Sequence, residues 1–227
     1  MNPAELAAEI ALLKDESKLA RDAGDYAGAI DQLSLAIELI DNSGWDDGLD
    51  PGAPVVEDRR KIAWHLADCL GMLGGNYRRI EQLDEAVRCF ERGRLYEQDS
   101  RFQVSSSYNS VNAIVAPIEA KLRDATSQTA ALRDAVSTLE RQIFDPDTVE
   151  ASRRLDRWAW ADLGQCQLLL GNAAEARAAY QRFIELSDAA TIQSSRDVLR
   201  SIERALRAKN DERAGVVAAG IEFLDSA

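Results

Sequence analysis

One spacing of large and small residues occurs three times along this chain of 227 residues. In the two clearest copies, residues 70–93 and 160–183, a Leu-Gly pair is followed by an alanine and then by an aromatic residue. Residues 13–36 hold a weaker copy. Because positions three and four apart share one face of a helix, each copy describes two apolar stripes joined by a turn. The spacing therefore predicts pairs of antiparallel helices.

The small residues of the pattern have a steric role. Glycine within a helix costs about 1 kcal/mol relative to alanine. Gly74 and Gly164 nevertheless stand at the same position of the two clear copies, which indicates that two helices approach each other closely there. Phe90 and Tyr180 are expected to fill the space between one hairpin and the next. A single hairpin cannot bury both of its faces, so the hairpins should stack.

This pattern resembles the tetratricopeptide repeat, whose members stack into a scaffold and bind other proteins. The resemblance implies an all-α fold: an antiparallel helix-hairpin solenoid of about 9–10 helices in a right-handed superhelix with a C-terminal capping helix. The whole chain, residues 1–227, would form one such solenoid. Its expected parts are repeats at about 10–41, 67–98 and 157–188, a degenerate hairpin at 101–144, an insertion loop at 41–54, a capping helix at 190–208, and a segment at 210–227 that forms a tail or a short terminal helix.

A second resemblance covers residues 60–206. The Tyr108-Asn109-x2-Asn112 segment and the Ser-Ser-Arg-x2-Leu-Arg run at 194–200 are similar to the repeat-containing regulatory region of apoptosis signal-regulating kinases and their bacterial relatives. In those proteins the region serves regulation and partner recruitment. The resemblance implies a regulatory, signalling role for this chain.

The net charge of −12 is concentrated near the N-terminus, where residues 1–58 hold 14 acidic and 3 basic side chains. Attraction to phosphate dominates nucleic-acid affinity, so an acidic chain of this kind is not expected to bind nucleic acid. The acidity serves solubility, or it forms a surface for a basic partner. The first residues lack the pattern of a signal peptide, and no apolar run is long enough to span a membrane, so a cytoplasmic location is expected.

Enzymatic chemistry has little support in the sequence. His65 is the one histidine, and its position beside the apolar stripe of its helix favours a boundary residue over a catalytic base. Cys69, Cys89 and Cys166 form no CxxC motif, so we expect buried thiols and neither a disulfide framework nor a zinc site. No phosphate-binding loop is present. We therefore expect no catalytic residues, no metal and no cofactor; a metal site made of carboxylates alone stays open.

The insertion loop at 41–54 is rich in glycine, proline and aspartate, which disfavours regular structure. Long loops in compact domains are commonly functional or disordered. Trp45 lies in this loop. It either packs the loop onto the body of the protein or is exposed as a contact residue for a partner.

In tetratricopeptide-repeat proteins the first helices of successive repeats line a concave groove. The resemblance implies that this groove binds a protein or peptide, and its basic stretch would suit a partner with acidic residues beside an aliphatic side chain. The alternative for these cations is an ordinary solvated helix surface. The positions of this chain that match the groove are Lys14, Lys18, Arg21, Arg78, Arg79, Asn109, Trp158 and Gln165.

The function that the sequence favours is a protein-interaction scaffold or adaptor. A self-assembling structural module, in which end repeats stack on copies of the same chain, is the main alternative. An enzyme subunit is a weaker one.

Overall fold

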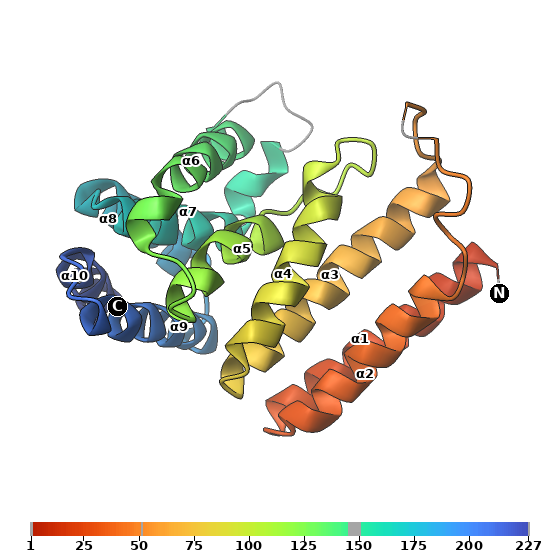
Figure 1. The fold of residues 1–227 in the computed structure, drawn as a ribbon, viewed down its shortest axis with the longest axis horizontal. Coiled ribbons are helices and arrows are strands. Elements are labelled where there is room, and N and C mark those ends of the chain that lie inside the picture. The colour runs from red at the N-terminus through yellow and green to blue at the C-terminus, as the bar shows by residue number, and fades with distance from the viewer. Residues whose placement is uncertain (1, 51, 145–150, 227) are drawn as a thin grey trace. The chain divides into compact units, whose positions relative to one another are not determined.

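The computed structural model describes residues 2–50, 52–144 and 151–226 (Figure 1). Within these ranges the regular elements are ten α-helices and two short 3-10 helices, without a strand. The all-α prediction is therefore confirmed, and most of the described helices form hairpins with the next helix along the chain.

The chain divides into two compact units, Met1–Ala113 and Ile114–Ala227, which are called unit 1 and unit 2 below. Helix α5, Tyr108–Glu119, crosses the boundary between them. The single right-handed superhelix over the whole chain stays a prediction.

Unit 1 contains two helical hairpins. The first pairs α1 (Pro3–Asp22) with α2 (Tyr26–Asp41), and the second pairs α3 (Glu57–Arg79) with α4 (Leu83–Gln98); α3 also packs against α1 and α2 (Figure 1). Asn2 caps α1, since its side chain accepts from the Glu5 amide while the Glu5 carboxylate accepts from the Asn2 amide. This capping box fixes the start of the first helix.

The insertion loop is held onto unit 1 by an aromatic cluster. Trp45 is 6% exposed, and its ring centroid lies 6.0 Å from that of Tyr96 and 5.7 Å from that of Phe102. Beside the cluster, Arg92 of α4 pairs with Asp41 at the end of α2 at 2.5 Å. Trp45 therefore packs the insertion loop onto the body of unit 1. The expectation of an exposed loop contact is wrong, because burying the indole in this aromatic cluster is more favourable than leaving it in water.

Unit 2 is built around α7. It contains α6 (Thr129–Phe144), α7 (Arg157–Leu170), α8 (Ala173–Glu185), α9 (Ala189–Ala208) and α10 (Arg213–Asp225), with short 3-10 helices at Ala125–Gln128 and Ala151–Leu155. The hairpins are α7 with α8 and α9 with α10, while α6 packs on α7 and α10 packs on both α7 and α8. Residues 213–225 therefore form a docked helix rather than a tail.

Close helix approach in both units depends on the two glycines of the repeated spacing. A Cβ at Gly74 would lie 2.7 Å from the Phe90 ring, and a Cβ at Gly164 would lie 2.8 Å from the Tyr180 ring. Both rings are almost completely buried. Each glycine thus gives an aromatic residue of the second helix room to lie against the first helix. The steric role predicted for both positions is confirmed.

A matched pair of glycine substitutions tests this packing. Gly164→Ala should destabilise unit 2 by about 1–3 kcal/mol, because the added methyl group overlaps the Tyr180 ring. Gly215→Ala on α10 should stabilise it by about 0.5 kcal/mol, because nothing lies within 4 Å of the added Cβ and alanine favours the helix. Urea-induced unfolding followed by circular dichroism measures both. A stabilising Gly164→Ala would contradict the packing argument.

Candidate functional site

A stripe of residues along α3 forms one face of unit 1. Trp64, Asp68, Gly71, Gly75 and Arg79 follow one another at intervals of three or four residues, so they share a side of the helix. Lys14 of α1 flanks this stripe on one side, and Tyr108 of α5 flanks it on the other. We call these seven residues, together with Lys18 and Arg21 of α1, the first-helix face of unit 1.

Tyr108 lies directly over the glycines of the stripe. A Cβ at Gly71 would lie 3.0 Å from Cδ1 of Tyr108, and a Cβ at Gly75 would lie 3.3 Å from its hydroxyl oxygen. The edge of the Phe90 ring also contacts Tyr108, with the centroids 5.8 Å apart. The absence of side chains at these two positions therefore lets α5 begin close against α3.

Lys14 is buried at the edge of this face, with 6% of its surface exposed. Its ammonium lies 2.5 Å from Oδ2 of Asp68 and 4.5 Å from the centroid of the Trp64 ring. A buried ammonium needs such partners, since leaving water costs several kcal/mol. The resemblance placed Lys14 in a partner-binding groove, and that role stays a prediction. In the structure its charge is paired with Asp68 and lies over the Trp64 ring.

Lys18 and Arg21 lie further along α1. Lys18 is exposed and pairs with Asp15 at 2.9 Å, and the partly exposed Arg21 pairs with Asp22 at 2.8 Å. Exposed pairs of this kind contribute only about 0–1 kcal/mol. Both cations can therefore exchange their present partner for another carboxylate at little cost.

Arg78 and Arg79 are adjacent in sequence but lie in different surroundings. Arg78 is half-buried, with its guanidinium 5.3 Å from the centroid of the Phe90 ring of α4. Arg79 is exposed and donates to the Gly75 carbonyl at 3.0 Å. Arg79 thus belongs to the first-helix face. Arg78 packs between α3 and α4, so it lies outside the first-helix face where a groove position was expected.

Asn109 is a structural residue. It is 2% exposed, and its Nδ2 donates to the Ala67 carbonyl and to Glu97, both at 2.9 Å. The Glu97 carboxylate also accepts from the Asn109 and Ser110 amides at the start of α5. A Cβ at Gly93 would lie 2.4 Å from the Asn109 side chain. The expected partner contact at Asn109 is therefore wrong, because unit 1 uses this side chain to join α3, α4 and α5.

In unit 2 the positions expected to face a groove are largely covered. Gln165 is 9% exposed, and every residue of α7 from Ala159 to Leu169 is buried. A Cβ at Gly220 of α10 would lie 2.6 Å from Leu168, which shows how closely α10 covers α7. Gln165 is thus not available to a partner. Trp158 at the start of α7 is 39% exposed and lies 6.3 Å from the Phe183 ring.

Trp64 is the functional candidate that the sequence analysis missed. It is 44% exposed, and its ring lies under the Lys14 ammonium. It lies one helical turn before Asp68, on the stripe of α3 that ends at the groove-matching Arg79. Extending the repeat offsets by one turn toward the start of α3 would have found it.

No cluster of three or more metal-binding side chains occurs among the described residues. Over the same ranges, each helix is too short or too polar to cross a bilayer. The three cysteines are buried, and burial raises the pKa of the Cys69 thiol to about 12 and that of Cys89 to about 11. The expectation of buried thiols is confirmed.

Comparison with known proteins identifies the repeat in unit 2. The sequence profile of the tetratricopeptide repeat matches residues 159–189, which span most of α7 and all of α8. Residues 159–189 therefore match a tetratricopeptide repeat, and the helices of the described chain form hairpins of the same all-α kind. A crystal structure of the MamA protein is similar over 96% of this chain and 88% of its own, with 16% identity and a TM-score of 0.41. No curated protein matches.

The Lys14–Asp68 pair predicts an asymmetry between two similar substitutions. Asp68→Asn leaves the buried Lys14 ammonium without its anion and should destabilise unit 1 by about 1–3 kcal/mol. Asp15→Asn removes the exposed partner of Lys18 and should cost less than about 0.5 kcal/mol. Thermal unfolding of both variants compares them. Equal losses of stability would mean that Lys14 is not held as described.

His65 supplies a pH test, since it is the sole histidine. Burial lowers its pKa from the ordinary value of 6.5, the Lys14 charge lowers it further, and Asp68 raises it. Folding therefore favours the neutral imidazole, so stability should be full above pH ~6.5 and should fall as the unfolded chain takes up a proton below it. Proton NMR should give a pKa below 6.5 that falls again in Asp68→Asn. An unshifted value would contradict the burial.

Proposed function

We propose that the protein is a non-catalytic adaptor that binds a protein or peptide at the first-helix face of unit 1. The single observation that carries this proposal is the state of Trp64, which is 44% exposed yet fixed by Lys14 through the contact over its ring. A large aromatic side chain already held in place loses little conformational entropy when a partner covers it. Tryptophan and arginine are also the residues most enriched among binding hot spots.

The rim of this face favours an acidic partner. Lys18 and Arg21 lie one and two turns beyond Lys14 on α1, and their exposed ion pairs are with carboxylates of the same helix. Arg79 lies 15 residues beyond Trp64 on α3, or about 22 Å at 1.5 Å per residue. A peptide with one or two carboxylates beside an apolar side chain would place the apolar group on Trp64 and the carboxylates on the cations. A regulatory, recruiting role follows if this partner is a signalling protein.

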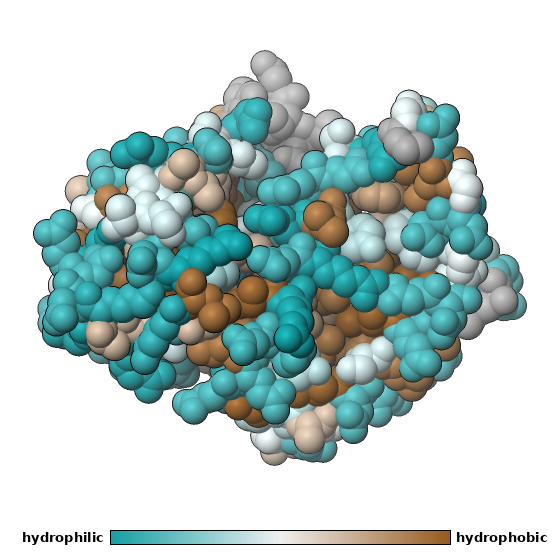
Figure 2. All heavy atoms as spheres, in the orientation of Figure 1, coloured by the Kyte–Doolittle hydropathy of each residue, from teal (hydrophilic) through white to brown (hydrophobic). Residues whose placement is uncertain are grey.

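Self-association is a second candidate, and one observation favours it. Leu12 and Leu19 lie seven residues apart on α1 and are 53% and 72% exposed. They therefore share a face of the first helix that unit 1 leaves uncovered. Figure 2 shows polar side chains over most of the visible surface, with smaller apolar areas between them.

Capture from a lysate of the source cells tests the proposal. The wild-type protein should retain a partner that Trp64→Ala loses by at least about tenfold, because the substitution removes the apolar anchor. Leu95→Ala is the matched control, since Leu95 of α4 is 62% exposed but lies outside the first-helix face. Circular dichroism should show that both variants are folded.

Two results would count against the proposal. A partner lost equally from the Trp64→Ala and Leu95→Ala variants would move the site away from Trp64. A wild-type protein that retains only further copies of itself, and that becomes monomeric in Leu12→Glu, Leu19→Glu by light scattering, would favour self-association instead.

A further inference from the structure

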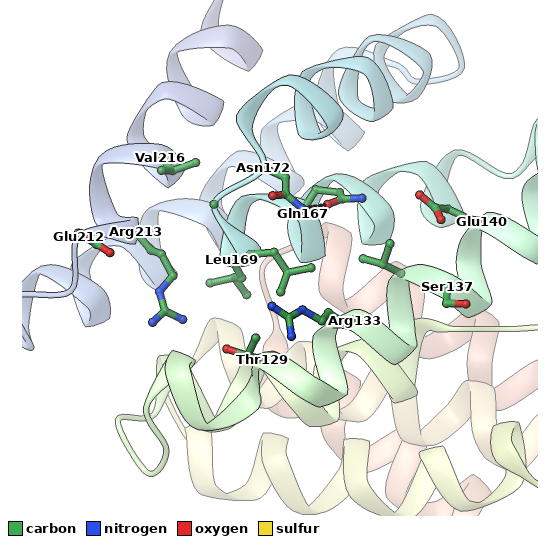
Figure 3. A pocket seen from close by; sticks show the side chains of 13 residues that line it. Thr129, Arg133, Ser137, Glu140, Gln167, Leu169, Asn172, Glu212, Arg213 and Val216 are labelled. Atoms are coloured by element: carbon green, nitrogen blue, oxygen red, sulfur yellow. Dashed lines mark hydrogen bonds between the residues drawn. The ribbon is translucent and has the colours of Figure 1, made fainter.

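A pocket of about 720 Å³ opens in unit 2 between α6, the α7–α8 turn and the start of α10 (Figure 3). This volume lies within the range of small-ligand sites. The pocket is at the C-terminal end of α7, whereas Trp158 is at the other end of that helix and Gln165 is buried within it. It is therefore separate from the positions that match a groove in the repeat pattern.

Two arginines reach into this pocket from different helices. Figure 3 shows the side chains of Arg133 on α6 and Arg213 on α10 extending into the space between the two helices. Arg213 is fixed, since its Nε donates to Asp211 at 3.0 Å and its Nη2 donates to Thr126. Among the described residues no carboxylate pairs with Arg133, which is exposed. One anchored and one unpaired guanidinium thus face the same space.

The remaining lining narrows the choice of anion. Glu140 and Glu212 also line the pocket, and Asp211 already pairs with Arg213, so a multiply charged phosphate would meet three nearby carboxylates. The first amides of α10 are already bonded to Asp211 and Glu212, so they offer no phosphate-binding donors. A planar carboxylate suits a guanidinium, which binds it through two parallel hydrogen bonds.

The spacing along α6 sets the size of the ligand. Arg133 and Glu140 both line the pocket and lie seven residues apart, or about 10 Å at 1.5 Å per residue. Three residues of an extended peptide span about the same distance. Val136, Leu169 and Val216 supply apolar lining for an aliphatic side chain.

The geometry points to a second ligand site in unit 2, which binds an extended peptide through a carboxylate at Arg133 and Arg213, an aliphatic side chain beside it, and a basic group about three residues earlier at Glu140. The carboxylate is that of a chain end or of an acidic side chain. This site does not depend on the first-helix face of unit 1.

The probe that tests this site is the peptide acetyl-Lys-Ala-Val-Leu with a free carboxyl end, titrated into the full-length protein labelled with ¹⁵N. Saturable shifts are expected at the amides of Thr129, Gly171 and Val216, which line the pocket on three separate segments. The same peptide with an amide end should bind about tenfold more weakly, because it lacks the charge that two arginines hold. An amide-ended peptide with aspartate in last place shows whether a side-chain carboxylate serves as well.

Two variants complete the test. Arg133→Gln should weaken binding of the free-acid peptide about tenfold. Arg141→Gln should leave this binding unchanged, because Arg141 is exposed on the same helix but does not line the pocket. Equal binding of the acid and amide peptides, or equal effects of the two substitutions, would overturn the assignment. So would the absence of saturable shifts at the three amides.

Discussion

The structure depends on the close approach of paired helices at positions that lack a side chain. Gly74 and Gly164 allow Phe90 and Tyr180 to lie against the first helix of their hairpins, where even a methyl group would overlap the rings. Gly93 does the same for Asn109, and this contact sets where α5 begins. The loss of helix propensity at such glycines is offset by the burial of a large ring, or of an amide whose Nδ2 donates to both α3 and α4.

The two units contain a similar hairpin, but they differ in how much of its first helix is exposed. In unit 1, the face of α3 between α1 and α5 keeps an exposed indole, which Lys14 and Asp68 hold in place. In unit 2, α10 packs on α7 and α8, and the corresponding face of α7 is buried. A pocket between α6 and α10 is open in this unit. The surface that could bind a partner is therefore the face of α3 in unit 1, whereas in unit 2 it is the pocket beside α7.

Residue spacing predicted the hairpins because it records which side chains share a face of one helix. The packing glycines and the buried cysteines follow from such local patterns, and the structure confirms them. Spacing does not record which distant segment covers a face. Gln165 matched a groove position but is covered in unit 2, and Asn109 matched one but is bonded to Glu97. Lys14 could not be told from a free cation without its neighbours on α3.

The most direct test of the account is photo-cross-linking with a benzophenone amino acid placed at position 64, and in separate variants at positions 158 and 95, in cells that contain the natural partner. All three native side chains are partly or largely exposed, so each position tolerates the probe. The partner is expected to cross-link to the probe at position 64 and not to the probe at position 95. A partner captured from position 158 alone would contradict this expectation and would place the binding surface on unit 2.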